Sequence, residues 1–324
     1  TYTHIVNQSG KTKAFCWYLW QIIKLFPVII FESLTWSLTM FTNYFKIALR
    51  NLLKQKTYSI INISGLAFGI ATCLIIFLYL RAELSYDEFN AHSDRIFRLE
   101  RQNLGPNGEI TGSGNTLAPS FTILLEKDFP EFEHIVRLYQ RQTRVEYGLN
   151  NFVESNLFFA EKDIFEVFTL PMIEGDPTTA LSEPFSVVLS RSTAQKYFGY
   201  ENPLGKKLEI FNNVFEVTGI IEDTPEYSHI HFDVIPSYLS LRGFGGSYNI
   251  KDDYFLGVDN FTDNVTYTYA RLANNVDPKA ISAKIPDFLD RNIHPVTLND
   301  GSIRNASQLV GIGIRNIKDI HIRE

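Results

Sequence analysis

YSIINISGLAFGIATCLIIFLYL, residues 58–80, contains no Asp, Glu, Lys or Arg and determines how the rest of the chain is placed. At about 1.5 Å of rise per residue, a helix of this length crosses the ~30 Å hydrocarbon layer of a bilayer. Lipid offers the backbone no hydrogen-bond partners, so a single crossing segment has to be helical. The run is longer than the core of a signal peptide and no small-residue cleavage site follows it, which predicts a retained transmembrane helix.

The charges on either side of residues 58–80 predict the orientation of this helix. Four cations and no acid lie between Met40 and Thr57, whereas acidic residues follow soon after Leu80. Positively charged flanks favour the cytoplasmic side of a membrane. We therefore expect residues 81–324 to form an extracytoplasmic domain.

Residues 40–57 have the pattern of a basic amphipathic helix. Apolar side chains recur at helical spacing, and Lys46, Arg50 and Lys54 follow one another at intervals of four. Such a helix lies on the inner leaflet of a membrane; the alternative is an ordinary helix docked on protein. Residues 1–39 are rich in aromatics but interrupted by charges and proline, which favours a cytoplasmic or interfacial prefix over a second span.

Gly65 and Gly69 form a GxxxG pattern inside the expected transmembrane helix. Small residues at this spacing allow two membrane helices to approach closely. Glycine is also common in membrane helices in general, so a packing face and a neutral composition are both open interpretations.

Composition excludes several classes of protein. The chain has 324 residues and a formal net charge of −6, and its one marked cluster of cations, residues 46–56, adjoins the membrane helix. Nucleic acid is therefore not an expected partner. The two cysteines, Cys16 and Cys73, lie before and within the helix. The outer domain has none, so we expect its stability to come from packing and not from disulfides.

The outer region mixes the periodicities of strands and helices without a fixed repeat, which predicts a mixed α+β domain in two lobes. Alternating apolar and polar residues predict strands at 96–102, 134–148, 153–160, 207–211 and 214–223. Helical spacing predicts helices at 120–129, 161–168, 190–199 and 277–292. Ser190 and Asp277 are expected N-caps, and Pro286 is expected to kink or split the last helix. The glycine-rich stretch 104–114 is expected to be a turn.

The outer region offers no convincing chemical site. Residues 199–207 resemble a phosphate-binding loop only loosely, because the spacing of the glycines is too long and Lys207 stands where a hydroxyl is needed. His229 and His231 could begin a metal site, but Asp233 is the one further ligand nearby, and a structural role is favoured. We expect no catalytic residue, no cofactor and no metal in this chain.

Five short motifs follow one another between residues 182 and 238. They are KYFG, NPLGK, VTGI, DTP and SHIHFD, at residues 196–199, 202–206, 217–220, 223–225 and 228–233. This combination resembles the periplasmic core domain of MacB-like, or FtsX-like, ABC transporter permeases of the Bacteroidetes type. Residues 43–71 and 85–100 are similar to the first membrane helix and first outer segment of that family, and residues 316–324 to the run before its second membrane helix.

The resemblance implies the permease subunit of an exporter or mechanotransmission machine. A partner ABC ATPase would bind Mg-ATP and hydrolyse it, and the membrane helices would carry the movement to the periplasmic domain. Residues 1–39 resemble no ATPase, so the ATPase is expected on a separate chain, and this chain is not expected to be an enzyme. Lys46, Arg50 and Lys54 would anchor the helix to lipid or to the ATPase.

The resemblance also implies further partners and a location. A second permease copy would complete a dimer, and a periplasmic adaptor and an outer-membrane channel are further expected partners. The protein would lie in the bacterial inner membrane, with residues 81–324 in the periplasm. The chain begins with Thr1 and no second span follows before Glu324, so we expect a piece of a longer membrane protein.

Two other functions are open from the sequence. A membrane-anchored periplasmic sensor domain would need a cytoplasmic signalling module, and residues 1–57 are too short and apolar for one. A tethered periplasmic enzyme would need a pocket with titrating groups of shifted pKa, and no motif predicts one.

The basic face before the membrane helix yields a direct test. Changing Lys46, Arg50 and Lys54 together to Glu is expected to impair membrane topology or assembly, because the reversed charges oppose retention on the cytoplasmic side. The outer domain should stay folded. Accessibility labelling and a transport assay measure the effect; unchanged transport in the triple variant would remove the anchoring role.

Overall fold

The computed structural model describes Trp20 and residues 40–244, 254–257, 260–298 and 300–321. The expected prefix, residues 1–39, therefore lies outside the described residues except for Trp20. The chain divides into two compact units, Thr1–Leu78 and Tyr79–Glu324, and each is described by itself.

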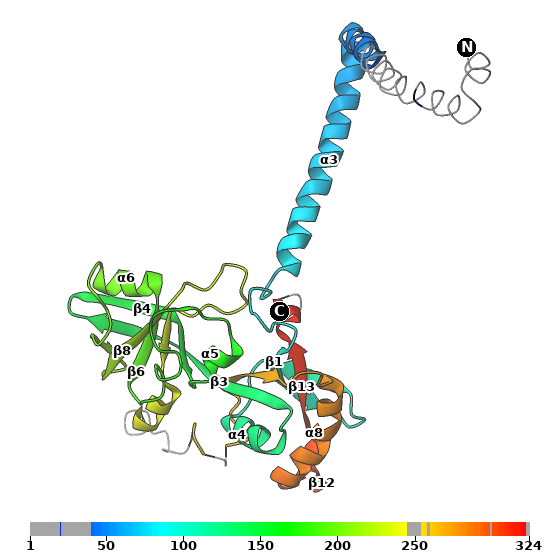
Figure 1. The fold of residues 1–324 in the computed structure, drawn as a ribbon. Coiled ribbons are helices and arrows are strands. Elements are labelled where there is room, and N and C mark those ends of the chain that lie inside the picture. The colour runs from blue at the N-terminus through cyan, green and yellow to red at the C-terminus, as the bar shows by residue number, and fades with distance from the viewer. Residues whose placement is uncertain (1–19, 21–39, 245–253, 258–259, 299, 322–324) are drawn as a thin grey trace, which may run out of the picture. The chain divides into compact units, whose positions relative to one another are not determined.

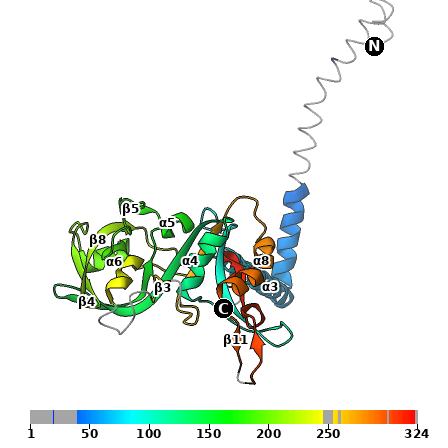
Figure 2. The ribbon, with the colours of Figure 1, turned by 90° about the horizontal axis from the view of Figure 1, so that it is seen from below.

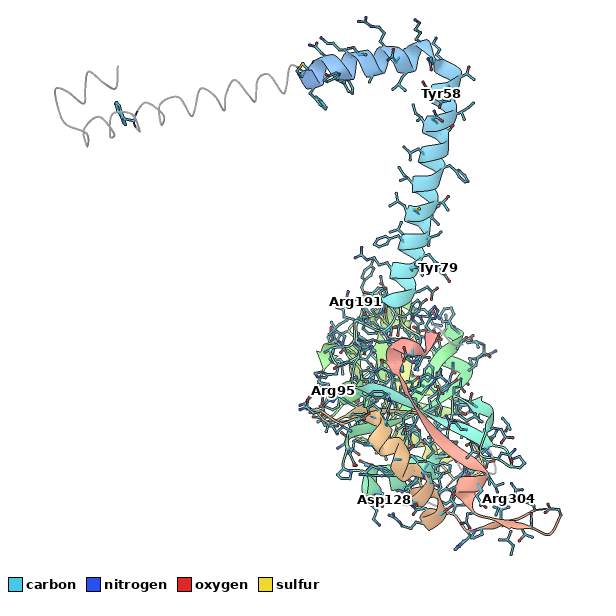
Figure 3. The ribbon with its side chains drawn as sticks, turned by 90° about the vertical axis from the view of Figure 1, so that its right-hand side faces the viewer. Tyr58, Tyr79, Arg95, Asp128, Arg191 and Arg304 are labelled. Atoms are coloured by element: carbon cyan, nitrogen blue, oxygen red, sulfur yellow. The ribbon has the colours of Figure 1, made fainter. Side chains whose placement is uncertain are left out.

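The apolar helix expected from the sequence is present. Helix α3 (Lys56–Leu84) continues beyond Leu80, as a stiff connection requires, and follows a helical stretch at residues 40–54. Among the described residues it is the one helix long and apolar enough to cross a membrane. Figure 3 shows its side chains between Tyr58 and Tyr79, where the large apolar residues are exposed. The limits of the membrane itself, at residues 58 and 80, stay predictions.

The second unit is built on one eleven-stranded sheet, in the order β13-β1-β10-β3-β4-β9-β6-β8-β5, with β2 paired to β1 and β7 paired to β3 and β8. Most neighbouring strands are antiparallel, but β6 pairs with β8, and β4 with β9, in parallel. A separate hairpin joins β11 (Val296–Thr297) and β12 (Ile303–Arg304). The strands of the large sheet are β1 (Ile96–Leu104), β2 (Ile110–Gly114), β3 (Phe132–Tyr147), β4 (Asn150–Ala160), β5 (Met172–Gly175), β6 (Ser186–Ser190), β7 (Lys207–Ile210), β8 (Asn213–Ile221), β9 (Val234–Pro236), β10 (Tyr267–Leu272) and β13 (Val310–Asn316).

The helices of the second unit gather at the two ends of this sheet. Figures 1 and 2 show α4 and α8 beside β1 and β13 at one end, α6 beside β4 and β8 at the other, and β3 running between the two groups. The predicted α+β class with two lobes is thus confirmed. The helical segments are α4 (Pro119–Asp128), α5 (Ile164–Val167), α6 (Arg191–Phe198), α8 (Pro278–Asn292) and the short 3-10 helices η1 (Tyr238–Phe244), η2 (Ala306–Gln308) and η3 (Ile317–Asp319).

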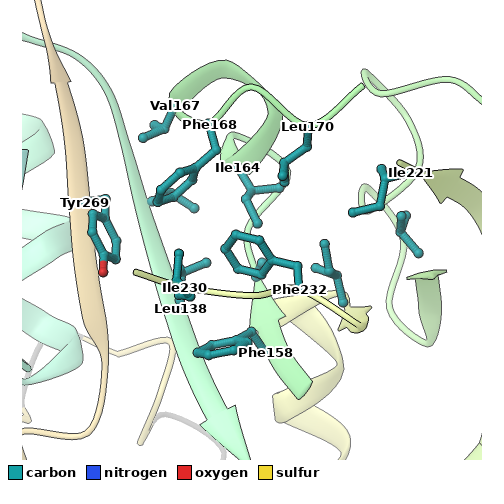
Figure 4. Packing of buried hydrophobic residues seen from close by; sticks show 14 of the residues in the cluster. Leu138, Phe158, Ile164, Val167, Phe168, Leu170, Ile221, Ile230, Phe232 and Tyr269 are labelled. Atoms are coloured by element: carbon teal, nitrogen blue, oxygen red, sulfur yellow. The ribbon is translucent and has the colours of Figure 1, made fainter. Parts of the chain in front are cut away.

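Three hydrophobic clusters fill the second unit. Because side chains alternate across a strand, Ile96 packs in a cluster with α5, whereas Phe97 and Leu99 pack on the opposite face with α4 and α8. A third cluster lies under α6. Figure 4 shows the α5 cluster, in which the rings of Phe168 and Tyr269 meet edge to face with centroids 5.0 Å apart. This cluster therefore packs β10 against the segment after α5 and against the loop between β8 and β9.

The predicted helix ends agree with the structure. The side chain of Ser190 accepts a hydrogen bond from the Thr193 N–H at the start of α6, and Asp277 accepts one from the Lys279 N–H at the start of α8. Gly199, just after α6, has a φ of 62°, a left-handed conformation that glycine adopts without strain. The predicted splitting of α8 at Pro286 is wrong, because the helix is continuous through that residue.

Several strands differ from the sequence-based prediction. The stretch 104–114 is not only a turn, since residues 110–114 form β2 and pair with β1. Residues 101–104 of β1 run past its pairing with β10, which ends at Leu99, and offer β2 hydrogen-bond partners that outweigh the poor strand propensity of glycine. The predicted helix at 161–168 is reduced to α5, a single turn. The short or glycine-containing strands β5, β6, β9 and β13 were not predicted, and neither was β10.

Asp277 allows a test of the capping interaction on α8. Asp277→Ala is expected to cost about 1 kcal/mol locally, which would speed hydrogen exchange of the first-turn amides about fivefold. Asp287→Ala, an exposed substitution on the same helix, serves as the control and should change exchange little. Equal protection in the two variants would show that the cap contributes nothing to α8.

Candidate functional site

The turn after α3 contains a carboxylate that is fully buried. Asp87 is 0% exposed and has a φ of 59°, a conformation that Asp and Asn tolerate better than most residues. One of its oxygens accepts hydrogen bonds from the Ser228 hydroxyl at 3.1 Å and the His229 N–H at 3.3 Å. The other lies 2.8 Å from Nδ1 of His229. The carboxylate is thus satisfied by the loop between β8 and β9.

His229 extends these bonds into the sheet. Its Nε2 lies 2.7 Å from the hydroxyl of Tyr269, in β10. In the neutral ring, Nδ1–H donates to Asp87 and Nε2 accepts from the tyrosine hydroxyl. We call Asp87, Ser228, His229 and Tyr269 the junction cluster. It connects the segment after α3 to strand β10 of the large sheet.

Further hydrogen bonds from backbone N–H groups fix the same turn at two more points. The Asp87 N–H donates to the carbonyl of Tyr227 at 3.0 Å. The side-chain oxygen of Asn90 accepts from the Thr169 N–H at 3.0 Å, and the Thr169 hydroxyl accepts from the Ala91 N–H at 2.8 Å. Thr169 follows α5, so the turn is held by loops from two different parts of the fold.

The outgoing end of the second unit meets the same segment. Nε2 of His321 lies 3.1 Å from a carboxylate oxygen of Glu83, and its ring stacks on Tyr86 with centroids 3.5 Å apart and planes inclined by 7°. We call Glu83, Tyr86 and His321 the outgoing contact. Nearby, the amide nitrogen of Asn316 lies 3.0 to 3.3 Å from three carbonyl oxygens of the incoming segment, those of Ser93, Asp94 and Ile96.

The junction cluster has the bonds of a structural connection and not those of a hydrolytic site. An activated nucleophile needs its hydroxyl against the imidazole base, but the Ser228 hydroxyl bonds Asp87. Ser228, Asp87 and Tyr269 are all at most 5% exposed, which leaves a substrate no access to them. Among the described residues, no group of three or more His, Cys, Asp or Glu side chains could hold a metal ion.

The other residues singled out in the sequence lie elsewhere. Lys46, Arg50 and Lys54 are exposed in the helical stretch at residues 40–54. Gly65 and Gly69 lie in α3, where an added Cβ would meet nothing within 4 Å. The anchoring and packing roles of these five residues stay predictions.

The phosphate-loop-like stretch is a turn between α6 and β7. Lys206 pairs with Glu201 at 2.5 Å, and the side chain of Asn202 accepts from the Leu204 N–H at 2.9 Å. Its lysine is therefore committed to a local ion pair. His229 and His231 do not act together, because His229 belongs to the junction cluster; the structural role predicted for His229 is confirmed.

A buried cation, Arg137, lies where the two lobes meet and pairs with the partly exposed Glu161. Arg137 in β3 bonds Glu161 at 2.5 Å and the carbonyl of Phe255 at 2.9 Å, and its guanidinium covers the ring of Tyr238 at 4.6 Å. Burial tends to lower the pKa of Arg137, but the neighbouring groups, with Glu161 foremost, together outweigh burial and raise this pKa. Burial raises the pKa of the Tyr238 hydroxyl above its usual range. These groups are paired with one another, and we assign them a structural role.

The junction cluster was not predicted from the sequence, although its parts were noticed separately. Asp87 lies in the stretch 85–100 and His229 in the motif 228–233. Both segments resemble the same family, and the fold brings them into contact. A polar residue in each of two motifs of one domain can indicate that the two motifs are hydrogen-bonded to each other. Their separation of 142 positions hides it from any local pattern.

Comparison with known proteins finds relatives of the outer domain. The family described as MacB-like periplasmic core domain matches residues 59–288. A domain assigned to a permease protein of Porphyromonas gingivalis has a TM-score of 0.57 and 16% identity, over 70% of this chain and 91% of that one. No curated protein matches the chain.

Two further solved structures are more distant. The periplasmic region of MacB from Actinobacillus actinomycetemcomitans has a TM-score of 0.43 and 16% identity, over 60% of this chain and 83% of its own. The extracellular domain of the noncanonic ABC-type transporter YknZ from Gram-positive bacteria has a TM-score of 0.40 and 14% identity, over 67% of this chain and 99% of its own.

Asp87 can be tested by substitution. Asp87→Ala leaves three donors without their buried acceptor and is expected to cost about 3 kcal/mol locally. Hydrogen exchange should then accelerate together in residues 85–91 and in residues 227–230. Glu88→Ala, an exposed neighbouring carboxylate, is the control and should leave both segments protected. Faster exchange confined to residues 85–91 would show that the cluster does not connect the two segments.

Proposed function

The chain belongs to the family of the MacB-like periplasmic core domain, which matches residues 59–288, and from this we propose that it is the permease subunit of an ABC transporter of the exporter or mechanotransmission type. The family match confirms the resemblance found in the sequence. It also supports a membrane-anchored protein with a periplasmic region. The similarity to the P. gingivalis domain supports the fold alone.

The junction cluster is the structural observation that supports the mechanotransmission part of this proposal. A mechanotransmitter has to pass the movement of a membrane helix to its outer domain without losing it in a flexible joint. α3 is helical through Leu84, and Asp87, three residues later, is bonded through His229 to Tyr269. Because these hydrogen bonds are shielded from water, solvent competes with them little. A displacement of the helix end should therefore move β10 with it.

The proposal places the energy source on another chain. A partner ABC ATPase would bind and hydrolyse Mg-ATP at the cytoplasmic side, and this chain would have no catalytic role. Lys46, Arg50 and Lys54 would face anionic lipid or that ATPase. A second permease copy, a periplasmic adaptor and an outer-membrane channel complete the proposed assembly in the bacterial inner membrane.

The identity of the machine is tested by purification from the native host. A tagged full-length protein should copurify with an ABC ATPase, and the rate of ATP hydrolysis should differ between that ATPase alone and the complex. Absence of any ATPase from the purified material, or hydrolysis that is indifferent to the permease, would count against the proposed function.

The role of the junction cluster is tested in the same complex. A spin label on a cysteine introduced at Tyr200, which is fully exposed, reports the distance between two outer domains by pulsed electron paramagnetic resonance, with Cys16 and Cys73 replaced. ATP should change this distance. Asp87→Ala should reduce the change, because the turn is released from the sheet, and Glu88→Ala should keep it. An undiminished change in Asp87→Ala would remove the cluster from the coupling route.

A further inference from the structure

A cavity of about 270 Å³ lies at the end of the sheet that carries α4 and α8. Figures 1 and 2 show these helices close to β13. The walls are almost entirely apolar, with buried side chains from the loop before α4, from α4, from α8 and from β13: Leu117, Phe121, Leu289 and Ile312. It lies in the lobe of β1 and β13, and its lining includes no member of the junction cluster.

One cation interrupts this apolar lining. Side chains alternate across β1, so Arg101 shares a face with Phe97 and Leu99, which belong to the α4 and α8 core. Directly opposite Arg101 in the register stands the buried Ile312 of β13. The guanidinium of Arg101 therefore occupies the next position after Phe97 and Leu99, where an apolar core side chain would be expected.

Arg101 has no anionic partner in the part of the chain that the structure describes. The cations on the other face of β1 and β13 are paired: Arg98 lies 2.7 Å from Glu100, and Arg315 lies 2.7 Å from the same carboxylate. Among the described residues that line the cavity there is no acid, and the remaining polar side chain is the hydroxyl of Thr262. A half-buried guanidinium beside apolar walls favours an anion that brings its own apolar surface.

We propose that this cavity binds a single-chain amphiphile with an anionic head, of the class of a medium-chain fatty acid. The carboxylate would pair with Arg101, and the chain would lie against Phe121, Leu289 and Ile312. The cavity is close to the lower end of the ~300–1,000 Å³ typical of ligand sites, which fits one short acyl chain and excludes a two-chain phospholipid. This inference is independent of the proposed coupling to an ATPase.

The proposal is tested on the full chain in lipid nanodiscs, without detergent, with a decanoate that carries a diazirine near the end of its chain. After illumination, mass spectrometry should find label on peptides that contain Phe121, Leu289 or Ile293. An excess of unlabelled decanoate should remove this label, and an excess of decanol should not. Label confined to α3, or equal competition by decanol, would overturn the proposal.

Substitutions give the second arm of the test. Arg101→Gln should reduce label on these peptides at least tenfold, whereas Arg304→Gln should retain it. Arg304 is a half-buried cation paired with Val296, which lines the cavity, but Arg304 itself does not line it. Ile293→Trp, at the half-exposed end of α8, keeps Arg101 and should block the cavity by its volume. Undiminished label in Arg101→Gln and Ile293→Trp would overturn the assignment, and unchanged hydrogen exchange of β1 and β13 verifies that both variants are folded.

Discussion

The hydrogen bonds to the buried carboxylate of Asp87 are the interaction on which the connection between the turn after α3 and the sheet depends. A carboxylate removed from water is stable only when donors surround it. Here two of the three donors belong to His229 and one to Ser228, so the turn after α3 and the loop before β9 have to arrive at the same place. This requirement fixes where the chain enters its sheet and makes His229 a fixed bridge to Tyr269.

Strand β1 links the two regions that we consider functional. It begins just after the turn that holds Asp87, and its first residues already lie in the buried layers. Its two faces then serve different purposes: Arg98 and Glu100 form a paired charge network with β13, while Phe97, Leu99 and Arg101 face α4 and α8. The alternation of a single strand thus separates a structural charge network from a candidate ligand site.

The sequence predicts the features that depend on neighbouring residues. Residues 58–80 predict a membrane helix from their composition, and Ser190 and Asp277 are recognisable caps because capping is decided within three residues. β2 and β13 could not be predicted from the sequence. These glycine-containing segments become strands because they pair with β1, which is a tertiary effect. The junction cluster escapes for the same reason, since nothing near His229 in the sequence indicates that its partner is Asp87.

The position of Asn316 has a mechanical consequence. β1 and β13 are antiparallel neighbours, and the first rung of their ladder pairs Phe97 with Asn316, beside the points where the chain enters and leaves the sheet. A force separating those two points would break the hydrogen bonds between β1 and β13 one pair after another. A sheet resists this direction of loading least. The hydrogen bonds of the Asn316 amide and the outgoing contact hold that end of the two strands together. Tension must therefore break these contacts together before the first strand pair can separate.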